Sequence, residues 1–234
     1  MGDEYFKNAY RPLLPQTLQL RYNNFEDLQY IDASVACVIV EPVQAETGII
    51  AASKDWLAAI EKKCKEHCAL LIFDEIQSGF GRTGSLFAFQ SIGIVPDILL
   101  LGKALGGGLP LGAFISHPAM MHLLTENPVL GHITTFGGNP VSCAAGLAAI
   151  NEIEKKSLNE KALELGEFLK SELLMIDGVT EVRGRGLLLG IVLEQDWAKE
   201  ITNFLMAKGV LANAPNANTI RIAPPLIEIG RAHV

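Results

Sequence analysis

A single lysine stands where an apolar run gives way to glycines. In DILLLGKALGGG, Lys103 follows the run 97–102 and comes shortly before the three glycines 106–108. A lysine at the end of a buried strand is expected to be partly desolvated, and this favours the neutral, nucleophilic amine that attacks aldehydes. The glycines would let the backbone turn tightly against a flat molecule. Lys103 is therefore a candidate for Schiff-base chemistry.

A carboxylate ends the preceding apolar run. In LLIFDEIQSGFGRTG, Asp74 follows the run 69–73, at the carboxyl end where open α/β sheets bind ligands. Capping of the next turn is an alternative role for Asp74. A Walker B strand has the same pattern but requires an upstream GxxxxGK[ST], and none precedes it. A carboxylate and a lysine at the ends of successive strands are the groups that pyridoxal phosphate requires.

Four apolar runs predict the strands that would position these groups. Continuous apolar runs are typical of strands covered on both faces of a parallel or mixed sheet, and here they occupy 35–40, 69–73, 97–102 and 112–116. Between the first two, apolar residues recur at helical spacing after Ser53, a suitable N-cap, at Trp56, Leu57, Ile60 and Cys64. The pattern predicts a β-α-β unit.

The second half of the chain has a different pattern. Asn139-Pro140 predicts the start of a long helix, because asparagine caps helices and proline suits the first helical position. A helix at about 157–175, a glycine-interrupted strand pair in EVRGRGLLLGIVL and a helix in DWAKEITNFLMAKG follow. We predict a larger α/β part at 1–146 and a small α+β domain at 147–234, joined by the long helix.

Composition narrows the classes of function. The 234 residues are 49% hydrophobic and 19% charged, which is typical of a globular protein. A net charge of −7, without a clustered basic face, argues against nucleic-acid binding. No run is long enough to span a membrane, and MGDEYFKNAY lacks the apolar core of a signal peptide, so we expect no membrane partner and a cytoplasmic setting.

The cysteines do not suggest a disulfide framework or a metal site. Cys64, His67 and Cys68 could share one face of a helix, but structural zinc takes four ligands. We expect an ordinary amphipathic helix there, no metal, and four reduced thiols in the chain.

Six blocks, in this order, resemble the class-III aminotransferases of the acetylornithine and ornithine type. They are EPVQAETGI, FDEIQSGFGRTG, PDILLLGKALGGGLPLGA, TTFGGNPVSCAAGLA, VRGRGLLLGI and IRIAPPL, and the resemblance extends over nearly the whole chain. It implies the α/β architecture called fold type I, with a mixed, mostly parallel sheet in a large domain, incomplete here, and a small α+β C-terminal domain. It also implies pyridoxal phosphate as cofactor and a homodimer with shared active sites.

The resemblance assigns roles around the cofactor. Lys103 would form the Schiff base and shuttle the proton, and Asp74 would pair with the pyridinium nitrogen. Gln77 would reach the phenolic oxygen of the ring. Thr135 would cross the dimer interface to the phosphate of the partner's cofactor; a turn residue before the helix cap is the alternative.

The resemblance also assigns roles around the substrate. Arg221 would bind the α-carboxylate through its planar guanidinium, and Glu46 would neutralise that arginine when a substrate enters by its distal amine, with Glu41 in support. The implied reaction is amino transfer from an ω-amine donor, such as acetylornithine or ornithine, to a 2-oxo acid acceptor, 2-oxoglutarate. An aminomutase or decarboxylating transaminase of the same class, or a non-catalytic truncated homologue that binds a partner chain, are the alternatives.

Three departures from the family pattern matter. Ala45 replaces the glycine of most relatives and is expected to shift Glu46. The family's upstream phosphate-binding loop and ring-stacking aromatic residue are not found, so we predict that 1–234 alone binds the cofactor weakly and has little or no activity. Residues 228–234, EIGRAHV, do not resemble the family, and we interpret them as translated adapter DNA at the end of a truncated sequence.

Overall fold

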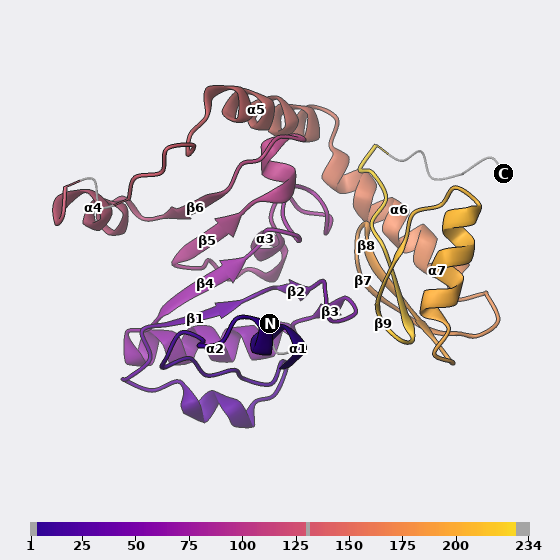
Figure 1. Cartoon of the computed structure of the whole chain (residues 1–234), viewed down its shortest axis with the longest axis horizontal. Helices are drawn as coiled ribbons and strands as arrows, with labels where there is room; N and C mark the ends of the chain where they lie inside the picture. The colour runs from indigo at the N-terminus through magenta and orange to yellow at the C-terminus, as the bar shows by residue number, and fades with distance from the viewer. Residues whose placement is uncertain (1–3, 130–131, 228–234) are drawn as a thin grey trace.

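The computed structural model describes residues 4–129 and 132–227. Within them, strands form two four-stranded sheets, ordered β1-β4-β5-β6 and β7-β8-β10-β9, and one short pair, β2-β3. Figure 1 shows the two larger sheets in separate halves of the molecule, with α5 and α6 passing from one half to the other. The interpretation of residues 228–234 as foreign lies outside the described residues.

The first sheet is mixed and mostly parallel. It contains β1 (Cys37–Val40), β4 (Leu70–Asp74), β5 (Ile98–Leu101) and β6 (Ala113–Ser116). Strands β1, β4 and β5 run parallel, whereas β6 pairs with β5 in the antiparallel sense. Each predicted apolar run thus contains a strand, and the predicted fold class is confirmed.

The helix between the first two strands of this sheet is confirmed as well. Helix α2 (Lys54–His67) begins after Ser53, whose side chain accepts a hydrogen bond from the Trp56 N–H at 3.2 Å. The predicted apolar positions of α2 are all buried, at Trp56, Leu57, Ile60 and Cys64. They belong to one core with β4 and β5, so the β-α-β unit buries the middle of the sheet.

The expectation that all four strands are covered on both faces is wrong for the two outer ones. Ile39 on β1 is 60% exposed and Ile115 on β6 is 52% exposed. The central strands are protected by neighbours on both sides, whereas the described residues leave part of each outer strand open.

The remaining elements of the first half are short. They are α1 (Glu4–Ala9), η1 (Glu26–Tyr30), β2 (Val43–Gln44), β3 (Ile50–Ala51), α3 (Ala88–Ile92), η2 (Lys103–Gly106) and α4 (Pro118–Glu126). None of these was predicted from the sequence, because short elements lack a periodic apolar pattern. The loop between β2 and β3 and the turn at η2 nevertheless carry predicted site residues.

The long connecting helix begins as predicted. Helix α5 (Pro140–Lys155) is capped by Asn139, which accepts hydrogen bonds from the N–H groups of Val141 and Ser142 at 3.0 and 3.2 Å. Helix α6 (Leu158–Leu173) follows. The proposed boundary at 146/147 falls within α5, and the division into two domains stays a prediction.

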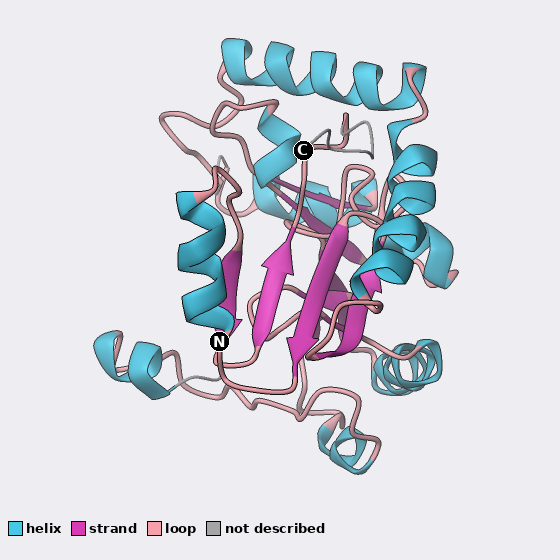
Figure 2. Ribbon diagram, turned by 90° about the vertical axis from the view of Figure 1, so that its right-hand side faces the viewer, coloured by secondary structure: helices cyan, strands magenta, loops and turns pink. Residues whose placement is uncertain are grey.

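The second sheet is antiparallel and consists of β7 (Val179–Arg185), β8 (Leu188–Leu193), β9 (Asn213–Asn216) and β10 (Thr219–Ile222). Helix α6 lies beside β7 and β8, and α7 (Ala198–Ala207) lies beside β9 and β10 (Figure 2). In β10, Ile220 and Ile222 pack into the core with residues of these helices. Because side chains alternate along a strand, Arg221 points to the opposite face.

Candidate active site

Asp74 and Lys103 occupy the carboxyl ends of neighbouring parallel strands. Asp74 is the last residue of β4 and pairs with Leu100 of β5, and Lys103 begins η2 just after β5 ends. Lys103 has a φ of +46°, in the left-handed region that residues other than glycine seldom adopt. Such backbone strain concentrates at functional sites, so the lysine's conformation is consistent with a chemical role.

The expected desolvation of Lys103 is not found. Its side chain is exposed, although α5 packs against the turn at η2 and Leu105 and Gly106 of that turn are buried. Lys103 nevertheless lies within electrostatic reach of Glu46, since its charge contributes to lowering the pKa of that carboxyl.

The carboxylate of Asp74 fits the ring nitrogen of pyridoxal phosphate. Its Oδ1 accepts a hydrogen bond from the Ile76 N–H at 3.0 Å, and the side chain is half-buried. Within the described residues Oδ2 has no hydrogen bond, so it can accept one from a protonated ring nitrogen. Together with the amine of Lys103, this set of groups fits the cofactor.

Glu46 links Gln77 to Arg221 across the two halves of the molecule. Its Oε1 accepts hydrogen bonds from Gln77 Nε2 at 3.1 Å and from Arg221 Nη1 at 2.7 Å. The bond to Arg221 is the main cause of the low pKa of the Glu46 carboxyl, and the bond to Gln77 adds to it. Three residues predicted to share one site are therefore in direct contact.

Ala45, next to Glu46, is part of the protein interior. Its side chain is fully buried in a small core with Val43, Ile49 and Leu188. The methyl group thus packs into the interior, and the 2.7 Å bond between Glu46 and Arg221 forms beside it. Ala45 is therefore compatible with the bond between Glu46 and Arg221, and the expectation that it shifts the glutamate stays a prediction.

A glycine in the second sheet makes room for this loop. Gly190 on β8 is directly opposite Arg221 in the register of the sheet. A Cβ atom on Gly190 would lie 3.0 Å from both the Gly48 carbonyl oxygen and Ile49 Cβ. The absence of a side chain at 190 therefore lets the loop that carries Glu46 lie against the face that carries Arg221.

Glu41 contacts the start of the same loop. Its Oε2 lies 3.4 Å from the Ala45 nitrogen, which donates to it. Burial is the main cause that raises the pKa of Glu41, and the negative charges of Asp74 and Glu46 raise it further. The hydroxyl of Tyr22 donates to the Glu41 carbonyl oxygen at 2.6 Å. Glu41 thus lies close to the site without contacting Arg221, and its supporting role stays a prediction.

Thr135 is placed apart from the other predicted residues. It lies in an exposed segment between α4 and α5. In the part of the chain that the structure describes, it has no hydrogen bond with Lys103, Asp74 or Arg221. The exposure leaves it available to a partner chain, and its contact with a partner's cofactor stays a prediction.

Glu75 is a buried carboxylate that sequence reasoning did not identify. It is 0% exposed and accepts hydrogen bonds from the N–H groups of Ala88 at 2.6 Å and Phe89 at 2.8 Å. Burial raises its pKa above the usual value. Glu75 ties the turn between Asp74 and Gln77 to the start of α3. A partner thirteen residues away leaves no local signal in the sequence.

Replacing Glu75 with alanine is expected to lower the free energy of unfolding by about 2–4 kcal/mol, because two buried N–H groups lose their acceptor.

The raised pKa of Glu75 means that the native state binds the proton of this carboxyl more tightly than the unfolded state does. The stability that Glu75 contributes therefore falls as pH rises from its unfolded pKa through its native pKa. Urea denaturation of wild type and Glu75→Gln across this pH range should show this slope in the wild type alone, and parallel slopes would contradict it.

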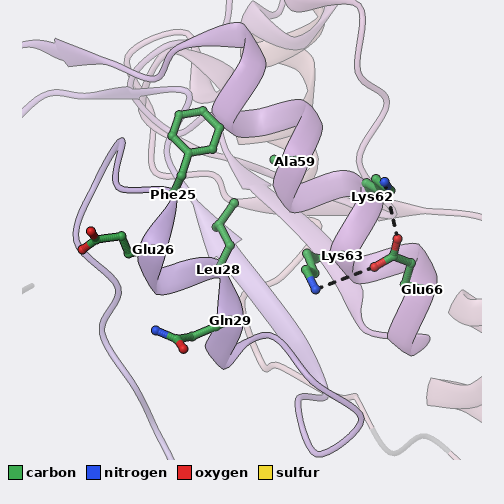
Figure 3. Close-up of a pocket in the computed structure, with 8 residues that line it drawn as sticks. All are labelled: Phe25, Glu26, Leu28, Gln29, Ala59, Lys62, Lys63 and Glu66. Atoms are coloured by element: carbon green, nitrogen blue, oxygen red, sulfur yellow. Dashed lines mark ion pairs between the residues drawn. The ribbon is translucent and has the colours of Figure 1, made fainter.

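The structure also contains a pocket between η1 and α2 (Figure 3). None of the predicted site residues lines it. Its lysines, Lys62 and Lys63, each lie 3.8 Å from the carboxylate of Glu66. The lining residues are Phe25, Glu26, Leu28, Gln29, Ala59, Lys62, Lys63 and Glu66. This pocket is separate from the residues that carry the predicted chemistry.

Metal sites and membrane spans are not seen in the described ranges. Among residues 4–129 and 132–227, no group of three or more His, Cys, Asp or Glu side chains could hold a metal ion. Cys64 is buried and Cys68 is exposed, and both are free thiols. Over the same ranges, no helix has the length and apolar character needed to cross a bilayer.

Comparisons with known proteins agree with this geometry. A family model described as aminotransferase class-III matches residues 4–231. The acetylornithine aminotransferase of Corynebacterium efficiens is 40% identical over 92% of this chain and 54% of its own length. The ornithine aminotransferase of Bacillus subtilis is 41% identical over 97% of this chain and 56% of its own length.

Solved structures show the same relationship. A structure of the ornithine aminotransferase from Toxoplasma gondii, described as having partial occupancy of PLP at its active site, has a TM-score of 0.88 and 31% identity. The match covers 96% of this chain and 55% of that one. The chain therefore spans little more than half the length of the curated relatives and solved structures that it matches.

Proposed function

The chain belongs to the class-III aminotransferases, whose cofactor is pyridoxal phosphate, and we propose that the full-length protein transfers an amino group from an ω-amine donor, such as acetylornithine or ornithine, to 2-oxoglutarate. The observation that carries the proposal is the contact of Glu46 with both Arg221 and Gln77, within electrostatic reach of Lys103. The names of the related enzymes support the choice of donor.

The cofactor, when bound, supplies an aldehyde for the amine and an electron-poor ring that accepts negative charge from the substrate carbon. Lys103 Nζ would hold the aldehyde carbon and later move a proton to or from the substrate carbon that carries the amine. Asp74 Oδ2 would accept a hydrogen bond from the ring nitrogen and keep it protonated. Gln77 Nε2 would donate to the ring's phenolic oxygen.

The exposures of Arg221 and Glu46 suit the use of two substrates. The Arg221 side chain is 18% exposed, whereas that of Glu46 is 63% exposed. The arginine is thus held by its surroundings, and the glutamate is free to rotate into solvent. Arg221 would bind the α-carboxylate of glutamate or 2-oxoglutarate when Glu46 is turned away. With Glu46 in place, the guanidinium is neutralised and a distal amine can enter.

The rival functions would use Arg221 and Glu46 differently. An aminomutase completes its reaction on one substrate and consumes no 2-oxo acid, so alternation of Glu46 between two positions would serve no purpose. A non-catalytic homologue would need neither Lys103 nor Arg221.

We further propose a cytoplasmic homodimer in which Thr135 reaches the partner's cofactor.

A panel of amine donors tests the proposed function. The full-length protein, loaded with pyridoxal phosphate, is expected to convert 2-oxoglutarate to glutamate with ornithine or acetylornithine as donor. The measurement is stoichiometric: one glutamate should form for each donor consumed. Donor isomerisation without 2-oxoglutarate would support an aminomutase, and release of CO₂ would support a decarboxylating transaminase.

Glu46→Gln is expected to change the balance between substrates. The uncharged amide no longer neutralises Arg221, so kcat/KM for the ω-amine donor should fall by about three- to tenfold relative to that for glutamate, the upper end being roughly 1.4 kcal/mol. The half-reactions with each substrate are measured separately by stopped-flow absorbance. An equal change in both would contradict the gating role. Lys63→Gln, in the pocket between η1 and α2 and apart from the predicted site residues, is the control.

A further inference from the structure

Arg82 joins the two halves of the molecule through backbone carbonyls. Its Nη1 donates to the Leu187 carbonyl oxygen at 3.2 Å and to that of Pro224. The N–H of Leu187 in turn donates to the Arg82 carbonyl oxygen at 3.0 Å. The side chain is half-buried, and no carboxylate pairs with it among the described residues. The guanidinium is therefore held by neutral groups alone.

The two segments that Arg82 contacts adjoin strands of the sheet that carries Arg221. Leu187 lies in the turn between β7 and β8, and Pro224 follows the end of β10. Pro224 is three residues beyond Arg221, whereas Arg82 lies on the stretch that continues from Asp74 and Gln77. One side chain thus connects the segment that would face the cofactor ring to the strand that would bind the substrate carboxylate.

The packing around this connection leaves little room for sliding. Gly186 has a φ of +56°, and a Cβ atom there would lie 2.6 Å from the Arg82 carbonyl oxygen. A Cβ on Gly81 would lie 3.3 Å from Leu226 Cδ1, and one on Gly84 would lie 3.0 Å from Leu163. Glycines on both sides therefore allow the backbones to approach closely and fix the relative position of the segments.

We propose that Arg82 is a positioning residue for carboxylate binding, which sets the place of the Arg221 guanidinium relative to Lys103 and Asp74. The inference rests on the proposed function of Arg221. Arginine suits this task because Nη1 carries two N–H groups in the fixed plane of the guanidinium, one for each carbonyl, whereas the lysine ammonium rotates at the end of a flexible stem. Burial of a charge without an ionic partner is costly, so a guanidinium kept in this position favours a positional role.

The test uses the full-length holoenzyme and glutarate, a dicarboxylate without a reactive carbonyl group. Its dissociation constant is measured by calorimetry for wild type, Arg82→Lys, Arg221→Ala and the double variant. Arg82→Lys is expected to weaken glutarate binding about tenfold. In the Arg221→Ala background it should have no further effect, because the group that it positions is gone.

Controls separate positioning from loss of fold. Each variant should retain the covalently bound cofactor, measured as pyridoxal phosphate content, and Arg82→Gln provides a second variant with an uncharged donor should the lysine variant fail to fold. Arg21→Lys, which changes a guanidinium bonded to Asp27 in the first half, should leave glutarate binding unchanged.

The outcomes distinguish the two proposals. Unchanged affinity in Arg82→Lys, or an additive effect in the double variant, overturns the role of Arg82 while Arg221 keeps its own. Unchanged affinity in Arg221→Ala overturns the carboxylate site itself and with it the proposed function.

Discussion

Replacement of Lys103 with alanine in the full-length protein is expected to abolish covalent attachment of pyridoxal phosphate and to lower turnover by about 10²- to 10⁴-fold or more. The lysine is assigned two tasks, as the nucleophile toward the aldehyde and as the proton carrier, and alanine performs neither. The position of Lys103 at the end of β5, next to the strand that ends in Asp74, is the structural basis for this expectation.

Borohydride reduction followed by peptide mass spectrometry measures the attachment directly. In the wild type, the peptide that contains Lys103 should gain the mass of the reduced cofactor, and in Lys103→Ala no peptide should. Lys208→Ala is the control, because that exposed lysine lies over the ring of Phe204, 5.6 Å from its centroid, in the second half. Attachment at another lysine of the wild type would overturn the assignment of Lys103.

The parts of the fold that the sequence predicts well are those decided by local interactions. Ser53 and Asn139 cap helices α2 and α5 with their own side chains, and each cap bonds to an N–H two or three residues away. The buried face of α2 follows from its apolar spacing in the same way. Such signals lie within one turn of helix, so a single sequence contains them.

Contacts between distant segments could not be derived in this way. Glu46 and Arg221 are separated by 175 residues. From the sequence, only the resemblance to a family predicted that these two side chains interact. The connections made by Glu75 and Arg82 had no local pattern and were missed. The exposure of a side chain is harder still to predict: Lys103 follows an apolar strand and its turn packs against α5, yet the lysine itself is exposed.

Asp74→Asn is expected to lower kcat by about 10²- to 10³-fold, the usual effect of removing one preorganised electrostatic group. Asparagine keeps an acceptor oxygen of similar shape, so the bond from the Ile76 N–H can persist. It lacks the negative charge that holds a proton on the ring nitrogen, and the ring then withdraws fewer electrons from the substrate carbon. The loss should therefore fall on the chemical step more than on binding.

The borohydride assay distinguishes this effect from that of Lys103. Asp74→Asn should retain covalent attachment at Lys103 while turnover is lost, because the aldehyde and the amine are unchanged. The pKa of Glu41 should also fall in this variant, since the charge of Asp74 helps to raise it. Asp97→Asn is a matched control: Asp97 accepts a hydrogen bond from the Leu71 N–H at 2.7 Å just before β5, so it should affect stability and leave turnover intact. Full turnover in Asp74→Asn would show that this carboxylate does not face the ring nitrogen, whatever the fate of Lys103.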